Sequence, residues 1–415
     1  MSFLERFFLC NVCICVTIFF KLNFELFEFV CLSVYLHKTN LFITESEISN
    51  IYTSYFTGRV HNSELVRMKL TLKYNETAEC KLEGITGMAT IKAAILGFGT
   101  VGQGIYHILN EKREELRHKL GIELEVAKIL VTDASRERVP GTAHLMTTSM
   151  DDVLAEPGMQ VVFEAIVNEE PAFTYLKRAV EHKCHVITAN KVMFAKKGLE
   201  LQDLAKANGV FVGYEATTAG GVPVIKTMKN ILLVNDVSRI QGILNGTCNY
   251  ILTKMRAEGW SFEMALKEAQ NLGYAEADPY NDISGQDSFK KLMVLSALAF
   301  GEQPDWADVD VIGIDSISAE QVKEATAKGL RYRHVAEVEK LAGGKIIAKV
   351  EPLLVDTEHP LYPVDDVNNA VALDTNYIGT LTLVGPGAGM YPTASVMVED
   401  YAEIIGKRAG FLVSI

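Results

Sequence analysis

The sequence predicts an α/β protein with two domains, and three observations support this prediction. The chain has 415 residues, more than a single hydrophobic core usually serves. From Ile91 to Tyr214, short apolar runs alternate with amphipathic helical patterns, which is typical of a parallel sheet with crossover helices. Beyond Pro223 this alternation stops, and we expect a second sheet of α+β type there.

The composition narrows the class of protein. A formal net charge of −12 argues against a nucleic-acid partner and favours an acidic, soluble protein. Of the seven cysteines, only Cys184 and Cys248 follow Met88, so the main part of the chain carries no disulfide framework. We therefore expect a reducing, cytoplasmic environment.

Residues 1–87 read as an atypical N-terminal extension. The apolar run Phe7–Phe20 is shorter than the ~20 residues that span a bilayer, and neither a positive start nor a small-residue cleavage site marks a signal peptide. Cys10 and Cys13 have the spacing of a redox or metal pair, but no second pair completes a ligand set. Because Met88 directly precedes the first expected strand, we favour an over-extended translation start. A membrane or targeting segment and a genuine domain are the alternatives.

A glycine-rich stretch organises the first domain. The apolar run Ala93–Leu96 is followed by G-x-G-x-x-G, and a helical pattern begins at Val101. Gly97 permits the tight turn, Gly99 lets a backbone approach a pyrophosphate, and Gly102 lets the helix pack close to the strand. The helix N-terminus adds unpaired N–H groups and a positive dipole end. Strand, turn and helix in this order predict a Rossmann-type dinucleotide-binding domain rather than an ordinary glycine-rich turn.

The ribose end of this domain carries mixed charges. One helix is expected from Gly102 to Gly121, followed by a strand at Leu124–Val131. Asp133 follows this strand, where an acid favours the free 2′-hydroxyl of NAD and an arginine favours the 2′-phosphate of NADP. Arg136 and Arg138 come soon after it, so the sequence leaves the choice between NAD and NADP open.

The rest of the first domain follows the same alternation. We expect strands at Val161–Glu164, His185–Ile187 and Val210–Tyr214, and helices at Pro171–His182 and Leu199–Asn208. Lys191 follows the second of these strands, where a parallel sheet opens its ligand crevice; the alternative is a solvated surface lysine. Glu215 and the small residues up to Pro223 suit a cation site built from backbone carbonyls, a substrate loop or a plain loop.

The second domain is expected to begin with a strand at Ile240–Leu244. A helix opens at Cys248, which we interpret as a small buried apolar residue, because no histidine stands near it in sequence to make it a nucleophile. Ser261 is expected to cap a further helix that Gly273 ends.

Two charged stretches of this domain are candidates for chemistry. Around Pro279, the carboxylates cannot share a helix face, and they could bind an ammonium group or solvate a loop; they are Glu276, Asp278 and Asp282. The expected helix Gly285–Phe300 carries Asp287 and Lys291 four residues apart, which a surface ion pair would explain. Apolar residues follow Lys291, however, so we expect this helix to be buried. Desolvation would then lower the pKa of the lysine and suit it to proton transfer.

Several motifs occur in one order along the chain. GFGTVG (97–102), TANK (188–191), EATTAGGVP (215–223), NGT (245–247) and YAEADPYNDISGQDSFKK (274–291) are followed by HPL at His359, NAV at Asn369 and GPGAGMYPTAS from Gly385. In this combination, from Met88 to the C-terminus, the chain resembles homoserine dehydrogenase in its short form, without a C-terminal regulatory ACT domain. The resemblance implies NAD(P)H-dependent interconversion of L-aspartate 4-semialdehyde and L-homoserine, in threonine and methionine biosynthesis.

The resemblance implies roles for residues of both domains. Lys291 would be the acid/base, Asp287 would orient it, and Lys191 would lie between the nicotinamide and the substrate. The cofactor would lie on Gly97, Phe98, Gly99, Thr100, Val101 and Gly102, with Lys191 and Gly387. The substrate would contact Glu276, Asp282, Thr247, Tyr274 and Lys291, with the two carboxylates holding its ammonium group. A structural sodium ion would be held by Glu215 and by carbonyls of Thr218, Gly220 and Val222.

The resemblance also implies an organisation for the chain. Residues 88–222 would form the dinucleotide-binding domain, completed by 385–415, and residues 223–384 the substrate-binding and dimerisation domain, with a homodimer formed through the second sheet. Thr132 departs from the family pattern, because NADP-using members usually carry arginine there. Two competing interpretations are a non-catalytic dinucleotide-binding redox regulator and a semialdehyde dehydrogenase, which would need an activated cysteine with a histidine base.

Overall fold

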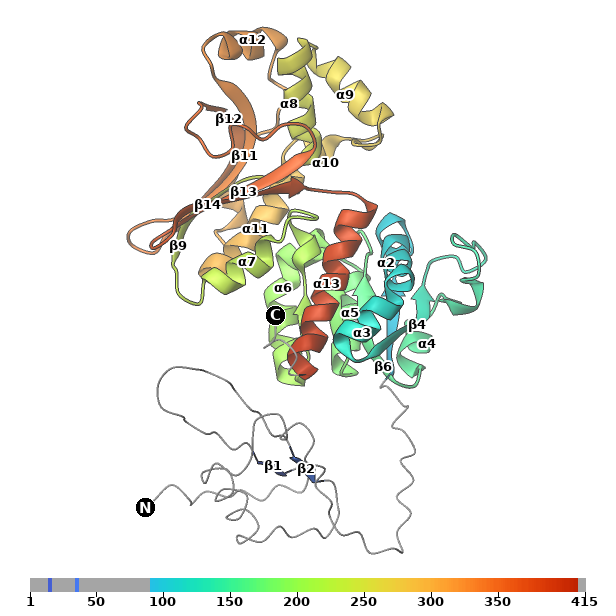
Figure 1. Ribbon diagram of the computed structural model, residues 1–415. Helices are drawn as coiled ribbons and strands as arrows, with labels where there is room; N and C mark the ends of the chain where they lie inside the picture. The colour runs from blue at the N-terminus through green and yellow to red at the C-terminus, as the bar shows by residue number, and fades with distance from the viewer. Residues whose placement is uncertain (1–13, 17–33, 37–89, 410–415) are drawn as a thin grey trace, which may run out of the picture. The chain divides into compact units, whose positions relative to one another are not determined.

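The computed structural model describes residues 14–16, 34–36 and 90–409 (Figure 1). The short strands β1 (Ile14–Val16) and β2 (Val34–Leu36) pair antiparallel within the unit Met1–Glu83, which is separate from the unit Gly84–Ile415. Apart from residues 14–16, the apolar run and the cysteine pair noted in the N-terminal extension lie outside the described residues. Within the described ranges, none of the helices has the length and apolar content needed to cross a membrane.

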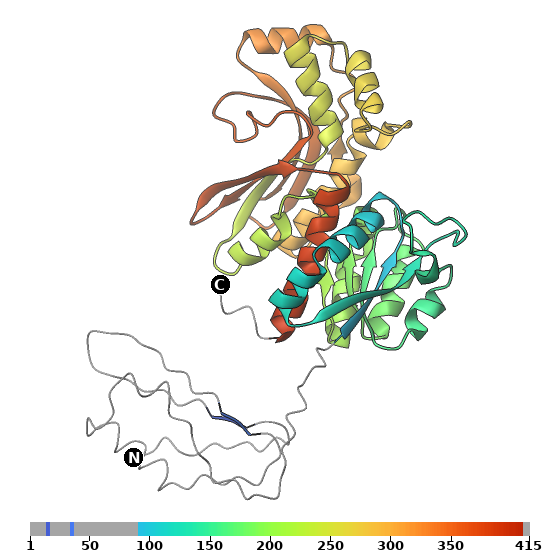
Figure 2. The same ribbon diagram turned by 45° about the vertical axis from the view of Figure 1, so that its right-hand side comes forward.

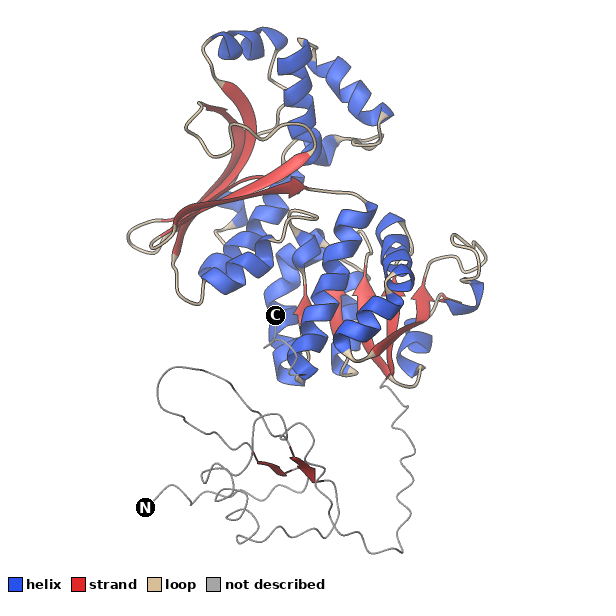
Figure 3. Ribbon diagram, in the orientation of Figure 1, coloured by secondary structure: helices blue, strands red, loops and turns tan. Residues whose placement is uncertain are grey.

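The first domain is built on a parallel six-stranded sheet in the order β5-β4-β3-β6-β7-β8 (Figure 3). Its strands are β3 (Thr90–Leu96), β4 (Glu123–Leu130), β5 (Met146–Thr147), β6 (Met159–Glu164), β7 (His185–Thr188) and β8 (Val212–Gly213). All neighbouring strands run parallel, and β3, the first strand of this domain, lies beside β6, its fourth, as in doubly wound dinucleotide-binding folds. The predicted Rossmann-type domain is confirmed.

Helices cover both faces of this sheet. One face packs against α2 (Thr100–Glu111), α3 (Arg113–Leu120) and α13 (Met390–Ala409), and the other against α4 (Met150–Ala155), α5 (Ala172–Glu181) and α6 (Lys191–Asn208). Successive residues of β3 point to opposite faces of the sheet. Ala93 and Ile95 pack into the core beneath α2, α3 and α13, whereas Ala94 and Leu96 pack into the core beneath α4, α5 and α6. Burial on both faces is the reason that this strand reads as a continuous apolar run.

The last helix of the described chain returns to the first domain. α13 lies beside α2 in both views (Figures 1 and 2). The two helices approach closely because Gly104 has no side chain; a Cβ there would stand 3.0 Å from the Cβ of Ala394. Residues from both helices, among them Ile105 and Ile405, share one core.

The prediction of one helix from Gly102 to Gly121 is wrong, because the backbone turns at Lys112 (φ −97°, ψ 11°) and divides it into α2 and α3. The change of direction lets Leu120 enter the same core as Leu109. The predicted end is confirmed, since Gly121 follows α3 in the left-handed conformation with a φ of 64°.

The helix that carries Lys191 begins earlier than predicted. The apolar pattern placed its start at Leu199, whereas α6 begins at Lys191 itself. Asn190 caps the helix, because its Oδ1 accepts a hydrogen bond from the backbone N–H of Met193 (3.0 Å). Lys191 is therefore the first residue of a helix, fixed in direction by the cap.

The second domain is built on a mixed six-stranded sheet in the order β10-β12-β11-β9-β13-β14. Its strands are β9 (Val237–Ile243), β10 (Asp310–Val311), β11 (Arg331–Lys340), β12 (Ile346–Val355), β13 (Asn368–Thr375) and β14 (Gly379–Pro386). Its helices are α7 (Val224–Ile231), α8 (Gly246–Glu258), α9 (Phe262–Asn271), α10 (Tyr280–Ile283), α11 (Gln286–Phe300) and α12 (Ala319–Ala327). All pairs are antiparallel except β10 with β12, which confirms the predicted α+β domain.

The acidic stretch before α11 was predicted to place its carboxylates on no common helix face, and the structure agrees. Pro279 precedes α10, a single helical turn, and the N–H of Tyr280 donates to the Asp278 carboxylate (3.2 Å). Only Asp282 lies on this turn, so the three carboxylates do not share a helix face. Glu276 stays exposed, while Asp282 is half-buried and accepts a hydrogen bond from Asn245 at the start of α8.

Candidate active site

The glycine-rich loop has the geometry that a pyrophosphate needs. Gly97 adopts a φ of +87°, and a Cβ on Gly102 would lie 2.1 Å from the carbonyl oxygen of Gly97, so only glycine permits this packing. A Cβ on Gly99 would meet no heavy atom within 4 Å, which means that this side of the loop faces open space. The first turn of α2 has neither an acidic residue nor a side-chain cap. Its N–H groups and positive dipole end therefore suit an anionic ligand.

One carboxylate and one guanidinium follow β4, the strand beside the glycine-rich loop. Oδ1 of Asp133 accepts hydrogen bonds from the backbone N–H (2.9 Å) and the hydroxyl (2.6 Å) of Ser135, and these bonds hold the pKa of Asp133 below its usual value. Nη1 of Arg138 donates to the carbonyl oxygen of Phe98, inside the loop (2.6 Å). Arg138 therefore contacts the glycine-rich loop, whereas Asp133 bonds to Ser135, and the choice between NAD and NADP stays open.

A single buried carboxylate joins two lysines from different domains. Lys191 opens α6 of the first domain, whereas Asp287 and Lys291 lie one turn apart near the start of α11. The Nζ atom of Lys191 lies 2.6 Å from Oδ1 of Asp287, and the Nζ atom of Lys291 lies 2.8 Å from Oδ2. The side chains of Asp287 and Lys291 are only 7% and 9% exposed, and that of Lys191 is 41% exposed. The expected burial of α11 is confirmed, and a surface pair is excluded for Asp287 and Lys291.

This arrangement gives the three groups different pKa values. Burial lowers the pKa of Lys291, and the nearby charge of Lys191 lowers it further, although Asp287 opposes both. The charge of Asp287 raises the pKa of Lys191, which is closer to solvent. Burial opposes ionisation of Asp287, but the two lysines outweigh it and hold the pKa of that carboxyl well below its usual range. Lys291 is thus the group best prepared to release a proton.

Two asparagines that sequence reasoning did not assign complete the polar network. Nδ2 of Asn245 donates to Asp282 (2.8 Å) and Asp287 (3.0 Å), while its Oδ1 caps α8. The carbonyl oxygen of Leu244 accepts from Nζ of Lys291 (2.6 Å) and from Nδ2 of Asn369 (3.0 Å). The helix-capping position of Asn245 was visible in the sequence, but its second role depends on α10 and α11 folding back on α8.

The residues expected to bind substrate differ in their burial and in their contacts with this network. Asp282 is linked to Asp287 through Asn245, and burial raises its pKa. The hydroxyl of Thr247 donates to the carbonyl oxygen of Tyr274 (2.7 Å). Tyr274 is 45% exposed, and its ring packs edge-on against Tyr250. Glu276 is exposed, yet its charge contributes to the raised pKa of Lys191.

The expected cation site contains a buried carboxylate with partners of its own. Both oxygens of Glu215 accept backbone hydrogen bonds at the start of α7, from Ile225 (2.7 Å) and Lys226 (2.8 Å), and burial raises the pKa of Glu215 to about 7. The buried hydroxyl oxygen of Thr218 has no hydrogen-bond partner, and the Val222 carbonyl accepts from Val224 (2.8 Å). Among the described residues, no group of three or more His, Cys, Asp or Glu side chains could hold a metal ion. A cation here would therefore depend on carbonyl and hydroxyl oxygens beside one carboxylate.

Gly387 lies where the chain crosses back to the first domain. The N–H of Gly221 donates to the carbonyl oxygen of Pro386 (2.9 Å), and a Cβ on Gly220 would lie 2.3 Å from the carbonyl oxygen of Gly387. A Cβ on Gly387 would lie 1.9 Å from Oδ1 of Asn369. The loop at Gly387 therefore touches both the first crossing between the domains and the asparagine that contacts Leu244.

Cys248 is buried among these groups but is not an activated nucleophile. Its thiol points at the carbonyl oxygen of Asp282 (3.1 Å), and burial raises its pKa well above the ordinary value. The interpretation of Cys248 as a buried residue is confirmed. The chemistry of a semialdehyde dehydrogenase, which needs a thiolate, finds no support here.

Fold and site together define an NAD(P)-dependent oxidoreductase, with a glycine-rich loop of the dinucleotide-binding type in one domain and a lysine–carboxylate centre (Lys191, Asp287 and Lys291) between two domains. Comparison with protein families identifies the group within this class. The family model described as homoserine dehydrogenase matches residues 223–402, and that described as the homoserine dehydrogenase NAD-binding domain matches residues 97–215. The chain belongs to the homoserine dehydrogenase family.

Individual relatives agree with this assignment. The homoserine dehydrogenase of Bacillus subtilis is 38% identical over 319 residues, covering 77% of this chain and 73% of that protein. The NAD(+)-dependent homoserine dehydrogenase of Pseudomonas canavaninivorans is 33% identical over 343 residues, covering 76% of this chain and 97% of that protein. The crystal structure of a homoserine dehydrogenase from Thiobacillus denitrificans is similar with a TM-score of 0.74 and 37% identity, covering 78% of this chain and 75% of that one.

Proposed function

We propose that the chain interconverts L-aspartate 4-semialdehyde and L-homoserine with NAD(P)H, using Lys291 as acid and base. One observation carries this proposal: Asp287 holds a lysine from each domain at hydrogen-bond distance, at the point where nucleotide and substrate domains meet. NAD(P)H, when bound, supplies the hydride that reduces the aldehyde carbon. Lys291 then donates a proton from Nζ to the carbonyl oxygen, where negative charge develops.

The two other charged groups prepare this transfer. Asp287 fixes the direction of the Lys291 ammonium, together with the Leu244 carbonyl. Lys191 is more exposed and has a raised pKa, so it keeps its charge. It would lie between the nicotinamide and the substrate oxygen. A permanent positive charge at that point stabilises the developing alkoxide without giving up its proton.

The substrate's ammonium group is proposed to bind Asp282 and Glu276. A buried ammonium requires carboxylate acceptors, and Asp282 is half-buried beside the lysine–carboxylate centre. Thr247 and Tyr274 would line the same pocket, with the Tyr274 carbonyl held by the Thr247 hydroxyl. Glu276 is exposed, so its carboxylate would lose its hydration only when the substrate covers it.

The dinucleotide is proposed to lie on the glycine-rich loop and to be either NADP or NAD. The open space at Gly99 and the free N-terminus of α2 fit its pyrophosphate. Asp133 favours the ribose 2′-hydroxyl of NAD, whereas Arg138 beside the loop can supply charge for the 2′-phosphate of NADP. Gly387 would complete the site where the chain crosses back.

A monovalent cation, sodium, is proposed for the loop from Glu215 to Val222. The unpartnered hydroxyl of Thr218 and the buried carboxylate of Glu215 are oxygen donors of the type a hard cation prefers. The carbonyls of Thr218, Gly220 and Val222 would add the remaining ligands. A bound cation would offset the burial that raises the pKa of Glu215.

We also propose a cytoplasmic homodimer formed through the second sheet. Ile347 of β12 and Val384 of β14 are 41% and 54% exposed, which leaves apolar side chains of two strands open to a second copy. The domains are proposed to be residues 88–222, completed by 385–415, and residues 223–384.

The decisive experiment mixes the purified chain with NADPH or NADH and L-aspartate 4-semialdehyde, and follows cofactor oxidation together with the formation of homoserine. We expect turnover that depends on both reactants. A protein that binds NADPH but does not oxidise it with this substrate would instead be the non-catalytic regulator.

A further inference from the structure

The side chain of Gln303, just beyond α11, forms hydrogen bonds to both domains. Its Nε2 donates to the carbonyl oxygen of Ala195 on α6 (2.8 Å) and to that of Met293 on α11 (3.1 Å). Its Oε1 accepts from Nε1 of Trp306 (2.8 Å). One amide therefore links a helix of the nucleotide domain to a helix of the substrate domain, and its two N–H groups and its oxygen are all used.

Along both helices, these bonds lie close to the lysine–carboxylate centre. Ala195 follows Lys191 by one turn of α6, about 6 Å along the axis, and Met293 follows Lys291 by two residues of α11, about 3 Å. A hydrogen-bonded helix transmits a shift at one turn to the next. A change in the separation of α6 and α11 at Gln303 therefore also moves the backbone of Lys191 relative to Asp287.

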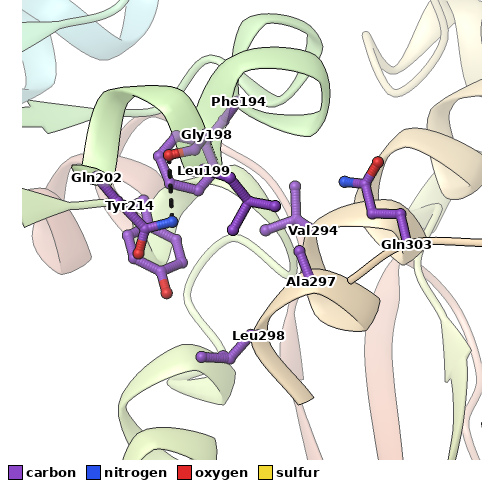
Figure 4. A pocket seen from close by; sticks show the side chains of 9 residues that line it. All are labelled: Phe194, Gly198, Leu199, Gln202, Tyr214, Val294, Ala297, Leu298 and Gln303. Atoms are coloured by element: carbon purple, nitrogen blue, oxygen red, sulfur yellow. Dashed lines mark hydrogen bonds between the residues drawn. The ribbon is translucent and has the colours of Figure 1, made fainter. Parts of the chain in front are cut away.

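The apolar contact between α6 and α11 is incomplete. A cavity of about 240 Å³ opens between the helices (Figure 4), and its lining residues are Phe194, Gly198, Leu199, Gln202, Tyr214, Val294, Ala297, Leu298 and Gln303. Apolar contacts are non-directional, and a gap between them forfeits part of their attraction. The bonds of Gln303 are directional, as is the ion pair between Lys191 and Asp287, so these contacts favour one spacing of the two helices.

We propose that Gln303 is a positioning residue that holds α6 against α11, and so keeps Lys191 on the carboxylate that Lys291 shares. This inference rests on the proposed function, since it concerns the geometry of the same proton donor.

Loss of the Gln303 bonds has a predictable electrostatic consequence. The charged or titratable groups that interact with Lys291 are Asp287 on its own helix, Lys191 on α6, Asp282 on α10 and Cys248 on α8. Lys290 on α11 and His334 on β11 interact with Asp287 instead. Lys191 is the group that moves when α6 separates from α11. When the positive charge of Lys191 is farther away, Lys291 is the only lysine paired with Asp287, and the pKa of Lys291 rises.

The test compares Gln303→Met with Gln202→Met in the full chain. Both changes replace an amide by a side chain of similar length at the same cavity. Within the described residues, however, the Gln202 amide bonds only to Gly198 of its own helix (3.2 Å; Figure 4). For Gln303→Met we expect kcat for aldehyde reduction to fall about tenfold or more, because small misplacements of reacting groups have large effects on rate. The KM for NADPH should not change, and the alkaline limb of the kcat–pH profile should move to higher pH. Gln202→Met should leave all three as in the unchanged chain.

Further variants keep the proposal open to refutation. If Gln303→Met does not fold, Gln303→Asn keeps an amide but is too short to reach both carbonyls, and it should show the same changes to a smaller degree. A folded Gln303→Met with unchanged kcat and pH profile would overturn the proposal, as would equal losses in the Gln202 variant. Failure of the proposed function shows itself differently, as absence of turnover in the unchanged chain.

Discussion

Replacing Asp287 by asparagine tests the centre of the site most directly. The change keeps the size of the side chain but removes the charge that two lysines share. Lys191 is 41% exposed and can turn to water, whereas Lys291 is 9% exposed and cannot. Leaving one buried partner of an ion pair uncompensated costs about 3–5 kcal/mol. Neutralising a lysine of ordinary pKa 10.5 costs a similar amount at pH 7, about 5 kcal/mol, but only about 2 kcal/mol at pH 9.

The sign of the pH dependence follows from these costs. In Asp287→Asn the pKa of Lys291 falls further below its unfolded value, so the unfolded chain binds the proton more tightly than the folded one. The stability deficit is then large at pH 6–7 and shrinks as the pH rises towards 9. Proton donation needs the charged lysine, so kcat for aldehyde reduction falls by roughly 10²–10⁴ at pH 7 and recovers as the pH is lowered. Stability and activity should therefore change with pH in opposite directions.

The assays are thermal unfolding and steady-state NADPH oxidation, each from pH 6 to pH 9. Asp151→Asn is a matched control, because Asp151 is 82% exposed and pairs with Arg178 at the surface. Pairs of that kind contribute little, so this variant should match the unchanged chain in both assays. A folded Asp287→Asn enzyme with near-normal kcat, or with activity and stability rising together, would refute the shared-carboxylate mechanism.

Four other predictions concern the donor, the cofactor, a buried acid and the domain boundary. Lys291→Ala should lower kcat by roughly 10²–10⁴ and leave the KM for cofactor unchanged; a folded variant with normal kcat would point to Lys191 as the acid. The ratio of kcat/KM values for the two cofactors should favour NADPH by less than about two orders of magnitude, since only two charge contacts differ, and Arg138→Ala should shift it towards NADH. Glu164 is buried at the end of β6 with its pKa raised to about 7, so its ionised form destabilises the fold as pH rises from 4.5 to 7; Glu164→Gln should raise the melting temperature at pH 8 and hardly at pH 5. Residues 88–415 alone should fold with the specific activity of the full chain, and an inactive shortened chain beside an active full one would contradict this.

The sequence determined those features whose cause is local. Glycine spacing in the loop from Gly97 to Gly102 follows from steric limits within a few residues, so the strand, turn and helix were predicted correctly. The spacing of Asp287 and Lys291 on one helix face, and the apolar residues after them, likewise predicted a buried pair. The turn at Lys112 was missed because neither glycine nor proline marks it; it results from packing Leu120 into the core.

Only the tertiary structure decided which charges share one carboxylate. Lys191 meets Asp287 because α6 and α11, from different domains, lie against each other, and no short-range pattern records that contact. The roles of Asn245 and Gln303 arise in the same way, since each side chain bonds to groups far away in sequence. Local sterics and helix periodicity act over a few residues, so they can be recognised in the amino-acid sequence. The electrostatics of the site depend on distances across the domain junction, which exist only after the two cores have packed.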